Sequence, residues 1–187
     1  MDDLCYNYSM FIEILVLGHL VSGPAHGYEI KQRVSRSIGT AQPLNNNILY
    51  PALRRLDEMG AVESELVQQG ASPPRRVYQL TDHGLDVLRG IVEDFPQESA
   101  LNDGEFNTRL AYFELIDPNS RLEILRTRAA AVENLLDHLR RSLAETTDQG
   151  RRPYAPRLLE FLIAQRESEL RFIEGLAREE AHREDLP

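Results

Sequence analysis

The chain of 187 residues contains no tryptophan and a single cysteine, Cys5. One cysteine cannot close a disulfide within the chain, which favours a reducing cytoplasm; alternatively, Cys5 is simply a small apolar residue near a terminus. The first ten residues contain no lysine or arginine, so the basic start of a signal peptide is missing. The longest apolar run, residues 10–21, is interrupted by Glu13 and His19 and is shorter than the roughly 20 residues that cross a bilayer. These absences predict a soluble cytoplasmic protein with no membrane partner.

The motifs that carry chemistry are also missing. We find no G-x-S-x-G, no P-loop and no pairing of a nucleophile with a base, so we expect no enzyme, no catalytic residue and no cofactor. His26 lies in a glycine-rich turn with no second histidine, cysteine or acid at ligand spacing. We therefore predict no metal site and expect His26 to have a local structural role.

Acidic residues outnumber basic ones, and the net charge is −9. Residues 1–93 carry eight Lys and Arg against eleven Asp and Glu, whereas residues 94–187 carry thirteen against nineteen. This balance argues against a protein that coats nucleic acid, but local distribution matters more than the sum. The basic residues of the first half, apart from Arg89, gather in three places: Lys31, Arg33 and Arg36; Arg54 and Arg55; Arg75 and Arg76.

Helical patterns dominate the N-terminal half. Residues 10–21 are apolar on nearly every side and predict a buried helix, and residues 28–38 predict a second helix. Residues 45–59 predict a third, with an asparagine run as its N-cap, Pro51 as a slight distortion and a core face of Leu49, Leu53 and Leu56.

A β-hairpin and a fourth helix follow. Residues 61–67 and 75–80 read as strands on either side of a Gly/Pro turn, and Thr81 or Asp82 caps the next helix. This order is that of a winged helix-turn-helix, in which the third helix enters the DNA major groove and the hairpin is the wing. The expected fold class is mainly α with a small β-hairpin.

The C-terminal half predicts long helices. The breaker-rich residues 95–104 mark a boundary between a DNA-binding domain with an N-terminal arm, residues 1–94, and a helical dimerisation domain, residues 95–187. A helix is expected at 105–115, another starts at Asp117-Pro118, and a last one spans 154–181. The helix after Asp117 carries a heptad seam: Leu122, Leu125, Ala129, Val132, Leu136, Leu139 and Leu143. Its partner is either the last helix or a second subunit.

Three stretches of the first half resemble the PadR family of transcriptional regulators. They are GPAHGYEI (23–30), ILYPALRRLDEMGAVES (48–64) and RRVYQLTDHG (75–84). The helical second half resembles the longer subgroup of that family. The resemblance implies a homodimeric, cytoplasmic regulator, usually a repressor, that loses affinity for DNA when a small molecule such as a phenolic acid or a drug binds.

Two features depart from the pattern of that family. Asn47-Ile48 stands where the family has small residues before Leu-Tyr-Pro, which puts the base contacts of the family in doubt at this point. The lack of tryptophan excludes a drug pocket built on tryptophan stacking.

The first turns of the third helix are expected to contact DNA. Asn46 and Asn47 lie opposite the leucine face, and an asparagine amide can bond adenine in the major groove; the alternative is helix capping. Tyr50 can reach a phosphate or pack on the second helix, and Arg54 continues the exposed stripe, while Arg55 is a contact or a solvated charge. The resemblance implies a phosphate contact for Tyr28. Adjacent strand residues point to opposite faces, so at most one wing arginine faces DNA well from the strand itself, although both can if the loop tip is disordered. The predicted DNA-binding residues are Tyr28, Lys31, Asn46, Asn47, Tyr50, Arg54, Arg75 and Arg76.

A dimer is expected on functional grounds, because an acidic monomer would bind a palindromic operator in double-stranded DNA weakly. The N-terminal arm, residues 1–9, is expected to help the interface, whose predicted residues are Leu122, Leu125, Val132, Leu136, Leu139, Leu143, Leu162 and Ile173. An inducer pocket is expected where the two halves meet, with the same residues packing the junction as the alternative; they are Tyr8, Phe11, His19, Phe95, Tyr112 and Phe113.

Two other functions stay open. The chain can be an activator or co-regulator that recruits a protein through its helical half. It can also be a winged-helix interaction module without DNA binding, which its acidic charge favours.

Overall fold

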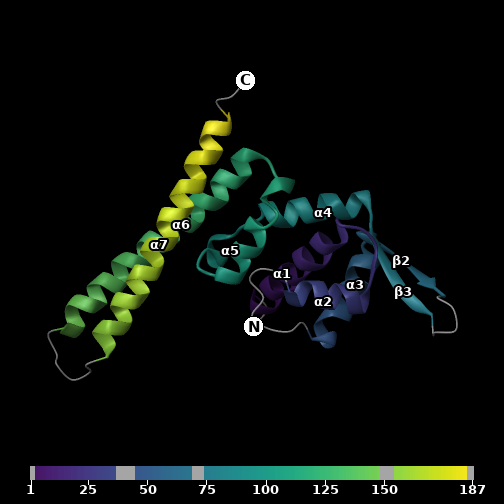
Figure 1. The fold of residues 1–187 in the computed structure, drawn as a ribbon, viewed down its shortest axis with the longest axis horizontal. Helices are drawn as coiled ribbons and strands as arrows, with labels where there is room; N and C mark the ends of the chain where they lie inside the picture. Colours follow the sequence, from purple (N-terminus) through teal and green to yellow (C-terminus); the bar gives the residue numbers. More distant parts are fainter. Residues whose placement is uncertain (1–2, 37–44, 69–73, 148–153, 185–187) are drawn as a thin grey trace. The chain divides into compact units, whose positions relative to one another are not determined.

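The computed structural model describes residues 3–36, 45–68, 74–147 and 154–184 (Figure 1). These residues form seven α-helices, two short 3₁₀ helices and one three-stranded antiparallel sheet. The expected fold class is confirmed. The chain divides into two compact units: residues 1–95 with 102–116, and residues 96–101 with 117–187.

The first unit is built around α1 (Asp3–Leu20). Its residues Ile14 to Leu17 are at most 1% exposed, which confirms the prediction of a helix buried on every side. The helix starts well before residue 10, so residues from Asp3 onward, which the sequence placed in an N-terminal arm, continue α1.

A helix-turn-helix pair follows, α2 (Gly27–Arg36) and α3 (Asn46–Glu58). The leucine face of α3 forms part of the core, since Leu49, Leu53 and Leu56 have no exposed surface. Pro51 lies inside α3, as the sequence predicts.

The sheet has the order β1-β3-β2, with β1 (Ala25–His26), β2 (Val62–Val67) and β3 (Arg75–Leu80). β2 and β3 form the predicted wing hairpin. β1 was not predicted, because its two residues follow Gly23 and Pro24 in a segment that reads as a turn. Its register pairs Ala25 with Tyr78 and His26 with Val77, so the start of the helix-turn-helix is joined to the wing.

The base of the wing is joined to α4 (Asp82–Glu93) through its N-cap, Thr81. The Thr81 hydroxyl donates to the Gly60 carbonyl at 2.7 Å and accepts from the Gly84 amide at 2.9 Å. A Cβ on Gly84 would lie 1.9 Å from the Ala61 carbonyl oxygen. Only glycine therefore permits this approach of the helix to the residue that precedes β2.

α5 (Asp103–Leu110) and the 3₁₀ turn η2 (Phe113–Leu115) also belong to the first unit. The fully buried Arg109 forms an ion pair with Glu105, donates to the Asp94 carbonyl at 2.9 Å and lies 5.3 Å from the centre of the Phe95 ring. These contacts fasten α5 to the end of α4. The division at 94/95 predicted from the breaker-rich sequence therefore differs from the packing, which also places residues 102–116 with the DNA-binding unit.

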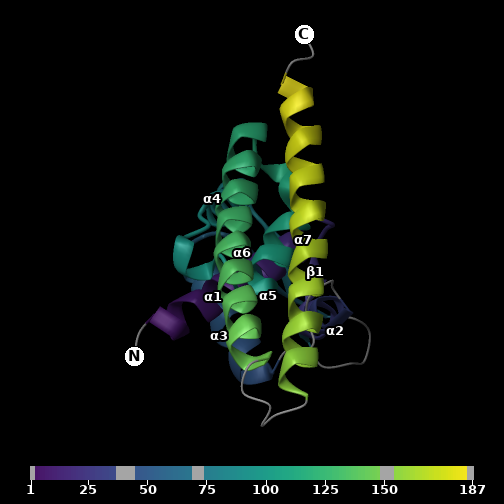
Figure 2. The ribbon, with the colours of Figure 1, turned by 90° about the vertical axis from the view of Figure 1, so that its left-hand side faces the viewer.

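The second unit is dominated by α6 (Pro118–Thr147) and α7 (Ala155–Glu184), which lie side by side (Figures 1 and 2). Asp117 caps α6 as predicted: it accepts from the Asn119 and Ser120 amides, and the hydrogen bond from the Ser120 hydroxyl lowers the pKa of the Asp117 carboxyl. The partner of the heptad seam within this chain is α7. Five seam leucines and valines are buried, namely Leu122, Leu125, Val132, Leu136 and Leu139, while Leu143 is half-buried.

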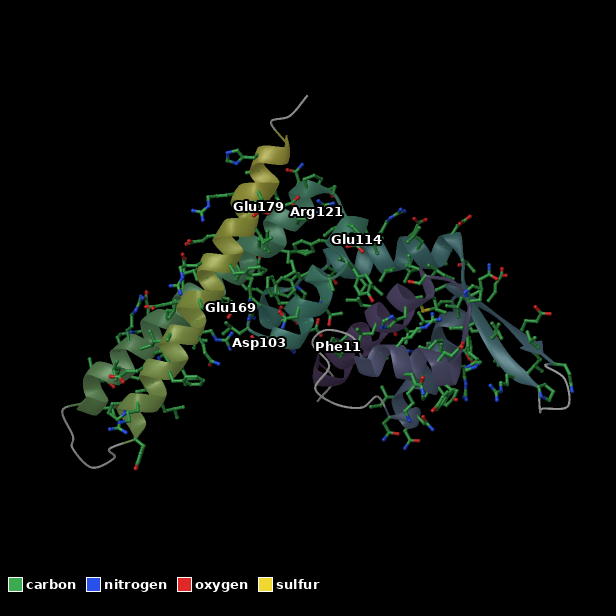
Figure 3. The ribbon with its side chains drawn as sticks, in the orientation of Figure 1. Phe11, Asp103, Glu114, Arg121, Glu169 and Glu179 are labelled. Carbon is green, nitrogen blue, oxygen red and sulfur yellow. The ribbon has the colours of Figure 1, made fainter. Side chains whose placement is uncertain are left out.

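Ion pairs set the antiparallel register of α6 and α7. Arg121 near the start of α6 bonds Glu180 near the end of α7 at 2.9 Å, and Arg140 bonds Glu167 at 2.8 Å. Between them the buried Arg128 pairs with Glu169 and donates to the Ala100 carbonyl, beside the 3₁₀ turn η1 (Gln97–Ser99), at 2.7 Å. Figure 3 labels Arg121 on α6 and Glu169 on α7.

None of the described helices has the length and apolar character that a membrane span needs.

Candidate nucleic-acid interface

The start of α2 is held by a reciprocal pair of side-chain to backbone bonds. The His26 amide donates to the Glu29 carboxylate, and the Glu29 amide donates to His26 Nδ1, both at 3.2 Å. This is the arrangement of a capping box, with an imidazole in the usual place of a hydroxyl. The expected local structural role of His26 is thus what the geometry shows.

An open hollow of about 480 Å³ lies beside this cap. It brings together four of the residues predicted to bind DNA and three that were not predicted. The lining residues are Tyr28, Tyr50, Arg75 and Arg76, with His26, Gly27 and Tyr78.

Aromatic rings form much of the hollow. Tyr28 is 63% exposed and Tyr50 is 45% exposed, so both phenols face solvent. Tyr50 also packs at the start of α2, because a Cβ on Gly27 would lie 3.0 Å from its ring. The packing role predicted for Tyr50 is therefore observed, Gly27 provides the space that its ring needs, and the phosphate contact stays a prediction. Burial raises the pKa of the Tyr78 phenol, while the nearby Arg76 acts in the opposite direction, so Tyr78 remains a neutral donor.

The two wing arginines have different partners. Arg75 Nη1 lies 3.5 Å from His26 Nε2, whereas Arg76 donates to the Ser64 hydroxyl at 3.1 Å and lies 3.8 Å from the Asp57 carboxylate. Both line the same hollow, and which of them contacts DNA stays a prediction. Although Arg75 and Arg76 are neighbours on β3, their long side chains both reach the same hollow. Asp57 offsets part of the charge of Arg76.

The first turn of α3 presents asparagines to solvent. Asn45 is the N-cap and accepts from the Asn47 amide at 3.0 Å, so capping is its role. Asn46 and Asn47 are exposed, as a DNA-reading turn requires. Lys31 of α2 donates to Asn46 Oδ1 at 2.8 Å. This hydrogen bond orients the Asn46 amide, so the two residues, both predicted to contact DNA, lie side by side.

Further along α3 the two arginines diverge. Arg54 is exposed, in line with the predicted stripe. Arg55 is 45% exposed and bonds Glu13 of α1 at 2.9 Å, so it links two helices.

The residues predicted for an inducer pocket have packing roles in the first unit. Phe95 stacks near Phe106 and Arg109, Phe11 lies 3.8 Å from the position of a Cβ on Gly104, and the Tyr112 ring fills the space beside Gly18. Phe113 is half-buried, and the Tyr8 side chain lies outside the described residues. A polar groove also lies between α6 and α7, where Glu133, Arg140 and Glu174 are among its lining residues. None of the residues predicted for an inducer pocket lines this groove or the hollow beside α2.

His19 is the unusual member of this set. Its Nε2 is buried and has no hydrogen-bond partner among the described residues, and neither has the Thr108 hydroxyl. Burial, and then the charge of Arg33, lower the pKa of the imidazole, so His19 is neutral near pH 7.

The residues predicted for dimerisation are used inside the chain. Ile173 is 1% exposed and faces α6 together with the half-buried Leu162. The seam therefore holds the α6–α7 pair together, which is one of the two partners that the sequence left open. A role of the same residues in a subunit interface stays a prediction.

Together, the helix-turn-helix of α2 and α3, the wing of β2 and β3 and the shared hollow define a winged helix-turn-helix of the DNA-binding type. A model of the Transcriptional regulator PadR-like family matches residues 16–90. The chain therefore contains a domain of this family of transcriptional regulators at residues 16–90.

Individual relatives agree with this assignment. The chain is 27% identical over 103 residues to the negative transcriptional regulator PadR of Bacillus subtilis (strain 168), a match that covers 54% of this chain and 56% of the relative. The match thus spans about half the length of that relative.

Solved structures of the family are also similar to the chain. A PadR family transcriptional regulator from Eggerthella lenta DSM 2243 has 35% identity and a TM-score of 0.42, with coverage of 54% of this chain and 82% of that one. Bacillus subtilis PadR in complex with operator DNA has 18% identity and a TM-score of 0.43, with coverage of 90% and 98%.

Proposed function

We propose that the chain is a sequence-specific DNA-binding regulator that acts as a homodimeric repressor in the cytoplasm and is released from its operator by a small aromatic molecule. The observation that carries DNA binding is the convergence of Tyr28, Tyr50, Arg75 and Arg76 on one hollow beside the exposed first turn of α3. Phenol hydroxyls and guanidinium groups are ligands for phosphate, and the asparagines beside them can read base edges. The description of the Bacillus subtilis relative as a negative regulator supports repression.

A homodimer follows from the balance of charge. The chain carries a net charge of −9, so a single winged helix has few phosphate contacts with which to overcome general repulsion from DNA. Two copies related by a two-fold axis would double these contacts and address two half-sites about 34 Å apart.

The first unit offers polar groups that an inducer can bind. The buried, unpartnered His19 Nε2 and Thr108 hydroxyl are the polar groups that a bound molecule could satisfy, and the phenol of Tyr112 stays neutral because burial raises its pKa. An aromatic acid or phenol matches this mixture of rings and hydrogen-bonding groups.

The test compares two single-charge variants on an operator fragment enriched from genomic DNA. Arg75→Ala removes a guanidinium that lines the hollow, and we expect weaker binding and a fall of about 0.9 in the slope of log K against log salt. The matched control is Arg89→Ala on α4, where the lost partner is the exposed Asp86, and we expect no change in either quantity. Equal effects of the two variants would remove the hollow from the interface. A folded dimer that binds no fragment at low salt would instead favour the interaction module.

A further inference from the structure

Lys31 and Asn46 connect the two helices of the helix-turn-helix through their side chains. The Lys31 ammonium on α2 donates to Asn46 Oδ1 at the start of α3, at 2.8 Å. Lys31 lies one turn after Tyr28, and Asn46 lies one turn before Tyr50, so the pair continues the surface on which these two tyrosines lie. The first residues of a recognition helix are those that reach base edges in the major groove. The bond therefore acts on a side chain at the position from which such a helix reads bases.

The ammonium determines which way the Asn46 amide points. An ammonium has three N–H donors and no acceptor, so it can bond the oxygen of an amide but not its NH₂ group. The Asn46 oxygen is accordingly turned toward Lys31, and the NH₂ group is turned away from it. The two side chains together present N–H donors and a positive charge, while the one acceptor of the pair is already engaged.

This arrangement does not suit adenine. An asparagine that reads adenine uses both ends of its amide: the NH₂ group donates to N7, and the oxygen accepts from the N6 amino group. At Asn46 the oxygen already accepts from a cation, so an adenine amino group placed there would meet the Lys31 ammonium donor against donor. Guanine presents two acceptors, N7 and O6, on the same edge. An amide NH₂ group and an ammonium side by side match these two acceptors.

The neighbouring Asn47 provides a contrast within the same turn. Its backbone amide donates to Asn45 Oδ1 at 3.0 Å, and within the described part of the chain its side chain has no hydrogen-bond partner. The Asn47 amide thus keeps both the donor and the acceptor that adenine requires. The two exposed asparagines therefore differ in chemistry, although they are identical in sequence.

We propose that Lys31 and Asn46 form one reading unit that selects guanine in the major groove. This inference rests on the DNA binding of the proposed function and specifies a base that its recognition helix reads. Lys31 has two tasks in this unit: it orients the Asn46 amide, and it offers its charge to the guanine edge. A lysine that only contacted a phosphate would have neither effect, since phosphates carry no sequence information.

The experiment selects binding sites from random-sequence duplex DNA with the full wild-type chain and with variants in parallel. For the wild type we expect one position in each half-site at which guanine is preferred over adenine by about tenfold to a hundredfold. Lys31→Met keeps an unbranched side chain but removes the ammonium, so guanine should lose this preference at that position and adenine should gain. Asn46→Ala should relax the same position. The double variant should lose no more than the larger single loss, because the two residues act together.

Arg33→Met is the matched control. It also removes one cation from α2, but at 100° per residue Arg33 lies about 200° from Lys31 and is exposed on another side of the helix. We expect its base preferences to equal those of the wild type. Circular dichroism checks that each variant keeps its helical content.

Modified bases test the contact at the level of single atoms. 7-Deazaguanine lacks the N7 acceptor, and at the preferred position it should weaken binding of the wild type by about tenfold. It should weaken binding of the Lys31→Met/Asn46→Ala double variant much less. Inosine lacks only the amino group in the minor groove and should bind as guanine does.

Three results would contradict these expectations in different ways. Weaker binding of Lys31→Met to every sequence, with unchanged base preferences and a salt slope smaller by about 0.9, would show a phosphate contact and overturn the proposal. A wild-type preference for adenine at the position that Asn46→Ala relaxes would also overturn it. Failure of the wild type to enrich any sequence would instead contradict the DNA binding of the proposed function.

Discussion

Two glycines on α4 should respond in opposite ways to the same substitution. A Cβ on Gly84 would lie 1.9 Å from the Ala61 carbonyl oxygen and 2.8 Å from its carbon, and real Cβ contacts stay above 3.0 Å. The obstacle is backbone, so Gly84→Ala must push α4 away from the residue that precedes β2 by about 1 Å. A Cβ on Gly90 meets nothing within 4 Å.

The expected magnitudes follow from these distances. Overpacking by one methyl against rigid backbone costs about 3 kcal/mol, and alanine regains about 1 kcal/mol of helix propensity. Gly84→Ala should therefore lose about 2 kcal/mol, while Gly90→Ala should gain about 1 kcal/mol. For a chain of this size, the difference of about 3 kcal/mol corresponds to roughly 6 to 12 °C in Tm.

Circular dichroism during thermal and urea unfolding measures both variants against the wild type. Because Gly84 also sets the position of the wing, Gly84→Ala should bind an enriched operator fragment less tightly than Gly90→Ala. Equal stability of the two variants would refute the close approach of α4 to Ala61.

Two further predictions concern ionisable side chains that the fold removes from water. The depressed pKa of His19 means that the unfolded chain binds more protons below about pH 6.5, the ordinary value for histidine, so stability is lost as the pH falls through that region. The free energy of unfolding of the wild type should therefore fall more steeply from pH 7.5 to 5.5 than that of His19→Leu, and parallel profiles would show that the imidazole is solvated. Arg128→Met removes the buried partner of Glu169, which keeps its ion pair with Arg166, and removes the donor to the Ala100 carbonyl, so it should cost about 1 to 3 kcal/mol in urea unfolding. Arg140→Met, at a pair that is half exposed, should cost less than about 1 kcal/mol, so similar losses in the two variants would contradict the burial of Arg128.

Sequence patterns that span only a few residues predicted most of the helices and strands of the first unit. The periodic leucines of α3, the asparagine cap and the alternating wing strands each depend on neighbours within a few residues, and the structure confirms them. β1 escaped prediction because a two-residue strand carries no periodicity; its pairing with β3 is a tertiary event. The boundary at 94/95 differs for a similar reason, since the packing of α5 on the first unit depends on Arg109 and its distant partner at Asp94.

For the residues that line the hollow, local sequence patterns also predicted some members and missed others. Tyr28, Tyr50 and the two wing arginines were among the predicted site residues. Tyr78 was not, although RRVYQL places it two residues beyond Arg76 and therefore on the same side of the strand. The role of Gly27 beneath the Tyr50 ring is visible only once α2 and α3 are packed. On α7, sequence periodicity identified the apolar residues but could not separate the buried Ile173 from the exposed Phe161 and Phe172, because both faces repeat at nearly the same spacing.

The most direct measurement of the central claim is the selection of genomic fragments by the wild-type chain, followed by footprinting of the most enriched fragment. The account predicts a two-fold symmetric footprint whose half-sites are centred about 10 base pairs apart, or a multiple of that, with affinity that falls steeply as salt rises. No enrichment over bulk DNA, or a single half-site footprint from a chain that is dimeric in solution, would contradict it.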